Sequence, residues 1–161
     1  MTDLLALLQQ FHREKLAMFL RHEDSARFVS QYDANNTYQY IINREDVQLS
    51  WLATAIADLG GQVADTVEPQ REVAGKGAEA ARAVIEADAR DAQAFVDRWQ
   101  PRVEAMTNAR QSGMLRVILG ETLEQQRFFE QALAGRVDLL GRRGQSLAAA
   151  HGEVLSSRWI E

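Results

Sequence analysis

The sequence predicts an all-α protein, and three observations support this fold class. Only two prolines, Pro69 and Pro101, occur in 161 residues, and residues with high helix propensity dominate the rest of the chain. No stretch alternates apolar and polar residues over a length that would indicate a strand. The hydrophobic fraction of 46% and the charged fraction of 25% are typical of a globular domain. We therefore expect one helical domain over residues 1–161.

Two helical patterns occupy the first third of the chain. The first begins at a capping residue, Thr2 or Asp3. Its apolar face recurs every three or four residues, at Leu5, Leu8, His12, Leu16 and Phe19. The face of the second comprises Tyr38, Ile41, Ile42, Glu45, Gln48, Leu52, Ile56 and Leu59. The second helix is expected to stop at Gly60-Gly61, because glycine takes the left-handed conformation at little cost.

The corner between these two helices has two candidates, Asp24-Ser25 and the segment 33–37, and the sequence leaves the choice open. A corner near residues 28–29 places His12 level with Glu45. A first helix that continues to residue 32 instead brings residues near His22 and Glu23 opposite Glu45 and places His12 too far along the bundle. The equal spacing in the two halves of the chain, described below, favours the first arrangement.

A long connection separates the second helix from the third. Residues 62–77 contain Pro69, Gly75 and Gly77 and show no clear periodicity. Extended at roughly 3.3 Å per residue, this segment reaches about 50 Å, whereas a helix of about 26 residues is roughly 39 Å long. The connection can therefore cross from one end of a helical bundle to the other.

Two further helices and a tail follow this connection. The third helix presents Ala81, Val84, Ile85, Asp88, Ala92, Phe95 and Trp99 and ends near Gln100-Pro101 or slightly later. The fourth presents Met114, Val117, Ile118, Glu121, Glu124, Gln125, Phe128 and Ala132 and stops at Gly135. Residues 136–161 are expected to form a weaker helical extension. The two halves resemble each other at an offset of 76 residues, which pairs Glu45 with Glu121 and predicts two helix hairpins joined by a crossover.

Polar residues interrupt the apolar face of every predicted helix. A buried carboxylate costs several kcal/mol unless it is neutralised, paired or bound to a cation. In the second and fourth helices another oxygen-bearing side chain follows three positions later, on the same face, so that both can reach one ion. Hard or borderline divalent ions accept carboxylate, imidazole and amide ligands. The pattern therefore predicts a metal site whose ligands are His12, Glu45, Gln48, Asp88, Glu121 and Glu124.

This arrangement resembles the ferritin-like superfamily. Its di-iron and di-manganese members, such as the rubrerythrins, are four-helix bundles with a long crossover after the second helix. In that family a glutamate precedes each Glu-x-x-His motif by a little over thirty residues, and here 33 residues separate His12 from Glu45 and Asp88 from Glu121. By residue type only Glu45 and Glu121 match the family's ligands. His12 and Asp88 stand where the family has glutamates, and Gln48 and Glu124 stand where it has histidines.

The resemblance implies a ferritin-like bundle over residues 3–134, an extension over 136–161, and two iron or manganese ions in the core. If the protein is an enzyme, the resemblance implies carboxylates that bridge two ions activating dioxygen or peroxide. The alternative is a metal-free, degenerate ferritin-like bundle that acts as a structural or protein-interaction module. In that case Lys15 turns inward and neutralises the carboxylates as an internal ion pair. Whether the chain has enzymatic activity stays open.

Three other side chains have structural interpretations. Tyr38 lies two turns before Glu45 on the same helix face, and we expect a core tyrosine whose hydroxyl is paired. His22 and His151 are expected at the surface.

Composition excludes several classes of function. The absence of cysteine excludes disulfides, thiolate metal sites and cysteine nucleophiles. A net charge of −5 argues against a general nucleic-acid binder, and no uncharged run is long enough for a membrane span. The N-terminus lacks the basic-then-apolar pattern of a secretion signal, so we expect a cytoplasmic protein. A helix surface used for homo-oligomerisation or for a partner protein is expected in either functional class.

Overall fold

The prediction of an all-α fold is confirmed by the computed structural model, which describes residues 2–64, 73, 75–136 and 139–140. Four helices make up the fold, and the described residues contain no strand. They are α1 (Thr2–Ala26), α2 (Tyr32–Asp58), α3 (Gly77–Glu104) and α4 (Ala109–Leu133).

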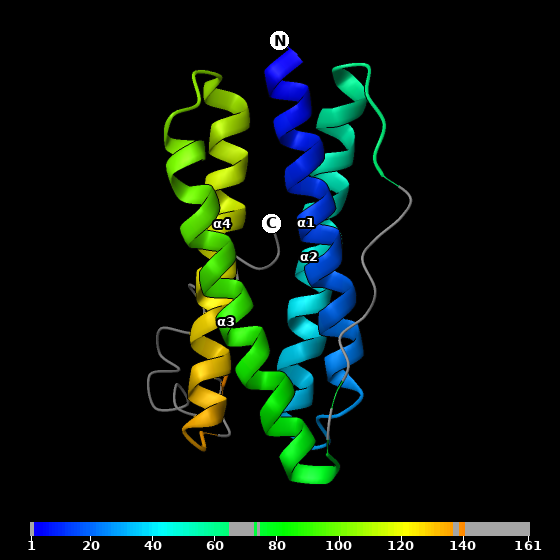
Figure 1. Ribbon diagram of the computed structural model, residues 1–161, viewed down its shortest axis with the longest axis vertical. Helices are drawn as coiled ribbons and strands as arrows, with labels where there is room; N and C mark the ends of the chain where they lie inside the picture. The colour runs from blue at the N-terminus through cyan, green and yellow to red at the C-terminus, as the bar shows by residue number, and fades with distance from the viewer. Residues whose placement is uncertain (1, 65–72, 74, 137–138, 141–161) are drawn as a thin grey trace, which may run out of the picture.

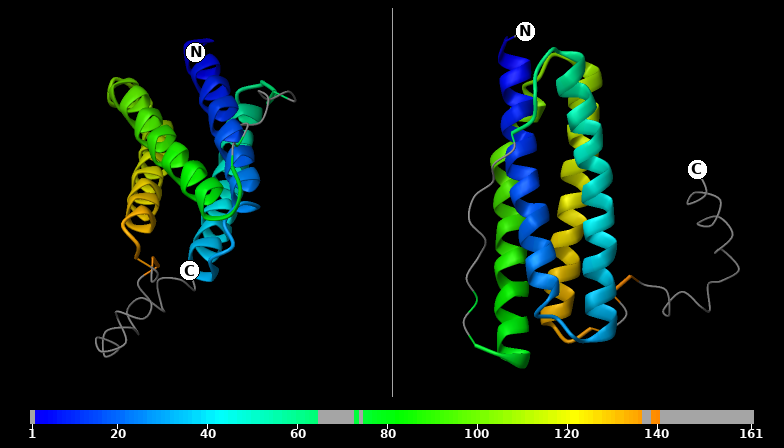
Figure 2. Two further views of the ribbon diagram at one scale, coloured as in Figure 1. Left: turned by 60° about the horizontal axis from the view of Figure 1, so that its bottom comes forward. Right: turned by 90° about the vertical axis from the view of Figure 1, so that its right-hand side faces the viewer.

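The helices pair as two antiparallel hairpins, α1 with α2 and α3 with α4 (Figure 1). The end of α2 and the start of α3 lie at opposite ends of the bundle, so these two helices run parallel (Figures 1 and 2). The connection between Asp58 and Gly77 therefore joins opposite ends, which the length of the predicted crossover allows.

The first corner falls at residues 27–31, between the two candidate segments. Asn35 stabilises this corner, because its side-chain amide donates hydrogen bonds to the carbonyls of Ala26 (3.1 Å) and Val29 (2.9 Å). The side chain of Gln31 caps α2 by accepting a hydrogen bond from the amide of Ala34 at 2.7 Å.

Glycines end two of the helices as predicted. Gly60 follows α2 with φ of 81°, and Gly135 follows α4 with φ of 91°. This left-handed conformation favours glycine because it has no Cβ.

The apolar core divides into two clusters. In the first, the ring of Phe11 packs against Phe95 and Trp99 with centroid distances of 5.1 and 4.9 Å. The second contains Tyr38 and Phe129, whose ring centroids are 5.3 Å apart. On α2 and α4, buried polar residues lie between the two clusters, as His22 does on α1. Together with the buried Lys15 and Asp88 they form a polar layer, which is the candidate site.

The inward face of α4 is rotated by one residue from the predicted face. Its buried residues are Ser112, Leu115, Ile118, Leu119, Thr122, Gln125, Gln126 and Phe129. The predicted face was wrong at Val117, which is 50% exposed, and at Glu124, which is exposed. The buried positions of the two hairpins correspond at an offset of 77 residues, which pairs Glu45 with Thr122 and Gln48 with Gln125. Because each residue turns a helix by about 100°, the shift from 76 to 77 moves Glu121 and Glu124 out of the core.

The predicted extension over residues 136–161 lies almost entirely outside the described residues. Within the described part, Leu139 is buried at the base of the bundle in the cluster that contains Phe129. None of the described helices is long and apolar enough to cross a membrane.

Candidate functional site

Four ionisable side chains meet in the polar layer, contributed by three helices. They are Lys15 and His22 from α1, Glu45 from α2 and Asp88 from α3. Lys15 and Glu45 are fully buried, and His22 and Asp88 are each only 1% exposed. Burying a charge is costly unless a partner compensates it, so the pairing within this group decides whether the bundle is stable.

Glu45 is held between Lys15 and His22 of α1. Its Oε1 lies 2.7 Å from Nδ1 of His22, and its Oε2 forms an ion pair with Nζ of Lys15 at 3.0 Å. Both carboxylate oxygens thus face positive or hydrogen-bonding groups of the protein itself. The internal ion pair that the metal-free alternative assigns to Lys15 is present.

Asp88 is engaged from two sides. The hydroxyl of Tyr38 donates a hydrogen bond to Oδ2 at 2.6 Å, and Nε2 of His22 lies 4.0 Å from Oδ1. The prediction that Tyr38 is a core tyrosine with a paired hydroxyl is confirmed. The prediction that His22 lies at the surface was wrong: its ring links Glu45 to Asp88.

The fourth helix contributes a hydroxyl where a carboxylate was expected. Nζ of Lys15 donates a hydrogen bond to Oγ1 of Thr122 at 3.0 Å, and Thr122 in turn donates to the carbonyl of Ile118 at 2.8 Å. Thr122 thus adds a neutral acceptor that solvates the buried ammonium.

Glu121 lies outside this network, at the seam between α2 and α4. Arg44 donates to both of its oxygens, at 3.1 and 2.8 Å, and Nε2 of Gln48 donates to Oε1 at 2.7 Å. Arg44 is 32% and Glu121 is 26% exposed, so this pair is far more accessible to water than Glu45.

The structure therefore separates the six predicted ligands. Glu45 and Asp88 share the central network through His22, and Gln48 bonds to Glu121 at the seam. Glu124 points to solvent. His12 is buried and its Nδ1 has no hydrogen-bond partner among the described residues. Burial, aided by Arg13, lowers the pKa of His12.

The corner lies near residues 28–29, the position for which His12 was predicted to face Glu45. The α1 residues that contact Glu45 are nevertheless Lys15 and His22. Side chains in a helix tilt toward its own N-terminus. In an antiparallel hairpin, His22 and Glu45 therefore lean toward each other along the bundle axis. Lys15 reaches the same carboxylate with its long stem. His12 makes no hydrogen bond or ion pair with Glu45 in the part of the chain that the structure describes.

This donor set does not fit a di-metal centre. The two carboxylates in the core already bind Lys15, His22 and Tyr38, and an ammonium beside Glu45 would repel a divalent ion. Among the residues with described positions, no group of three or more His, Asp or Glu side chains is arranged to hold a metal ion. Metal binding by the six residues stays a prediction, and its test is given below.

Electrostatics couple the pKa values of His22 and Glu45. Burial alone would lower the pKa of His22, but the carboxylates of Glu45 and Asp88 outweigh this effect and raise it above 6.5. Burial alone would raise the pKa of Glu45, but His22 and Lys15 lower it below 4.5. These directions favour an imidazolium at position 22, so that two cations face two carboxylates.

We expect stability to fall on the alkaline side of neutrality. A raised folded-state pKa stabilises the protein fully below 6.5, the unfolded value of His22, and this contribution is lost as pH rises through the folded-state value. Thermal unfolding of the native protein from pH 6 to 9 should therefore show a declining melting temperature. The variant His22→Gln should be less stable at pH 6 and show a flatter profile. Parallel profiles for the two proteins would contradict the assigned role of His22.

The predicted ligand set omitted His22 and Thr122, although the alternative position of the first corner placed the region of His22 opposite Glu45. The charged neighbours Arg21 and Glu23 make His22 resemble a surface residue. For Thr122 a signal was present: Leu115, Ile118, Thr122, Gln125 and Phe129 follow the same three-four spacing as the series chosen. A comparison of the chain with protein-family models, curated proteins and solved structures finds no match.

Proposed function

We propose that this chain is a metal-free ferritin-like bundle that serves as a helical interaction or assembly module. The observation that carries the proposal is the buried ammonium of Lys15, 3.0 Å from Glu45 and 3.0 Å from Thr122. This cation, together with His22, supplies the positive charge that two metal ions supply in metal-binding members of the superfamily.

The order and direction of the helices support the ferritin-like part of this proposal. Two antiparallel hairpins joined so that α2 and α3 run parallel are the arrangement expected of that superfamily. The inward-facing pairs Glu45-x-x-Gln48 and Thr122-x-x-Gln125 occupy positions comparable to its two Glu-x-x-His motifs.

One exposed face supports the interaction role. We define the α2–α4 face as Tyr40, Arg44, Val47 and Trp51 of α2 together with Val117, Glu121 and Phe128 of α4. Val47 is 38% and Val117 is 50% exposed. The Tyr40 and Phe128 rings meet across the seam at 6.4 Å, and Arg44 lies 5.7 Å from the Trp51 ring. Partly exposed apolar and aromatic side chains around arginine are typical of the core of a protein interface. We assign this face to self-association.

One chromatographic experiment tests both parts of the proposal. Protein is purified without chelator from cells supplied with iron and manganese, and is then passed through size exclusion with in-line light scattering and elemental detection. We expect metal well below one ion per chain and a mass that is a multiple of the 18.1 kDa monomer. One to two ions per chain would overturn the metal-free assignment and favour the di-metal prediction.

Two exposed valines provide matched variants for the mass measurement. Val117→Glu places a charge in the α2–α4 face, whereas Val63→Glu places the same charge at a 37% exposed position beyond the end of α2. The first is expected to yield monomer and the second to keep the native mass. A monomeric native protein would contradict self-association. A cytoplasmic location and the absence of a nucleic-acid partner stay predictions from composition.

A further inference from the structure

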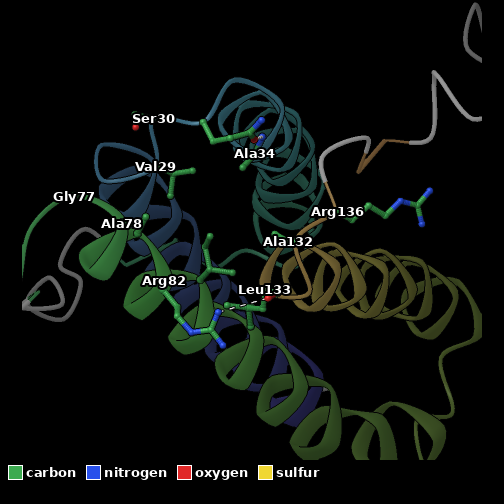
Figure 3. A pocket seen from close by; sticks show the side chains of 13 residues that line it. Val29, Ser30, Ala34, Gly77, Ala78, Arg82, Ala132, Leu133 and Arg136 are labelled. Carbon is green, nitrogen blue, oxygen red and sulfur yellow. Dashed lines mark hydrogen bonds between the residues drawn. The ribbon is translucent and has the colours of Figure 1, made fainter.

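A cavity of about 370 Å³ opens at the base of the bundle. The α1–α2 corner, the first turns of α3 and the end of α4 surround it (Figure 3). Small-molecule sites in proteins occupy roughly 300–1,000 Å³, so this cavity is large enough for a compact ligand. It lies away from the central network and beyond the function proposed above.

The walls of the cavity are apolar and built from small side chains. Four of the lining residues are alanines, at positions 34, 78, 81 and 132, and Val29, Ile85 and Leu133 complete the apolar surface. Ala34 and Ile85 belong to the buried cluster at this end of the bundle, so one side of the cavity is continuous with the core. An apolar chain placed there would be removed from water, which is favourable in proportion to the area buried.

The rim of the cavity carries a guanidinium group. Arg82 reaches from α3 toward α4, where Nη1 makes a long hydrogen bond of 3.5 Å to the carbonyl of Leu133 (Figure 3). Arg136 also borders the cavity, but its side chain extends away from it (Figure 3), and no acidic residue is among the described residues that line the cavity. Glu86 pairs with Nε of Arg82 at 3.3 Å, whereas Nη1 of Arg82 is directed at Leu133 of α4.

The start of α3 adds backbone donors to the same rim. Gly77 and Ala78 line the cavity, and their amides belong to the first turn of the helix, which has no intrahelical acceptors. The N-cap residue, Lys76, provides no side-chain hydrogen bond to this turn. Amides at a helix N-terminus and a guanidinium both favour an anionic group.

We propose that this cavity binds an amphipathic monocarboxylate, with its apolar chain against the alanine walls and its carboxylate between Arg82 and the first turn of α3. The apolar walls account for the chain, and Arg82 with the first-turn amides of α3 accounts for the charge of the headgroup. Binding requires that Nη1 of Arg82 exchange its long contact with Leu133 for the ligand carboxylate, while Nε keeps its pairing with Glu86.

Calorimetric titration of the full chain with decanoate and with decanol tests the headgroup. We expect decanoate to bind, and decanol, which has the same chain without charge, to bind more weakly. Arg82→Gln should weaken the binding of decanoate by about fivefold or more, because a charge-assisted contact is lost. The same substitution should leave the affinity for decanol unchanged. Arg90→Gln, at an exposed position on the same helix, should leave both unchanged. Equal binding of the two probes, or of decanoate to Arg82→Gln and the native chain, would overturn the proposal.

A second pair of variants tests the location. Ala81→Leu fills the cavity and should abolish decanoate binding, whereas Ala83→Leu, exposed on the same helix, should not. Amide chemical-shift changes on decanoate addition should centre on Ala78, Ala132 and Gly135. A native chain that does not bind decanoate, or shifts centred elsewhere, would contradict the proposal, and circular dichroism of each variant establishes that it is folded.

Discussion

Replacing Lys15 with methionine is expected to lower the free energy of unfolding by about 3–5 kcal/mol, the cost typical of removing one partner from a buried ion pair. The substitution keeps the length of the side chain but leaves Oε2 of Glu45 without the ammonium at 3.0 Å, and Thr122 without its donor. Chemical denaturation at pH 7 measures the change.

The matched control for this variant is Lys76→Met. Lys76 is the only other lysine in the chain and lies exposed at the N-cap of α3. Its replacement should change the free energy of unfolding by no more than about 0.5 kcal/mol. Similar losses for both variants would show that the ion pair does not carry the stability assigned to it.

Replacing Tyr38 with phenylalanine is expected to cost about 1.5–3 kcal/mol. The ring and its contact with Phe129 remain, but Oδ2 of Asp88 loses the hydroxyl that donates to it at 2.6 Å. A hydrogen bond to a buried charged group is worth more than one between neutral groups, and its loss leaves the carboxylate incompletely solvated.

Tyr40→Phe provides the comparison on the same helix. Tyr40 is half-buried at the α2–α4 seam, where it contacts the ring of Phe128. Its hydroxyl does not join the central network, so its removal should change stability by less than about 0.5 kcal/mol. Denaturation curves that reverse the order of these two variants would contradict the role given to Asp88.

The four helices and their ends were largely accessible from the sequence. Spacing of three and four residues marks a helix face whatever its partner, and Gly60 and Gly135 stop helices through their own backbone conformation. The connection between Asp58 and Gly77 was predictable from its length and its lack of periodicity. Each of these features is set by local sequence, so it can be predicted without knowing the tertiary packing of the helices.

The inward face of α4 required tertiary information. Two interleaved series fit the helical spacing, one through Val117 and Glu121 and one through Ile118 and Thr122. A hydroxyl is far cheaper to bury than a further carboxylate, and that difference favours the second series. The prediction chose the first series because it treated the glutamates of this helix as metal ligands.

The side chain that pairs with Glu45 could also not be predicted from local sequence. Whether His12, Lys15 or His22 meets this carboxylate depends on the axial offset between two helices and on the tilt of their side chains. The prediction identified Glu45 and Asp88 as core residues that need compensation, and both are buried. It left open whether a metal ion or Lys15 supplies the positive charge, because both satisfy the same electrostatic demand.

A double-mutant cycle on Lys15 and Glu45 is the most direct test of the central claim, which is that Lys15 compensates the buried charge of Glu45. The cycle compares the free energies of unfolding of Lys15→Met, Glu45→Leu and the double variant with that of the native chain. If the two side chains compensate each other, the double variant should lose less stability than the two single variants lose together. The difference should be roughly 2 kcal/mol or more. Losses that add to within about 0.5 kcal/mol would show that the two side chains do not depend on each other.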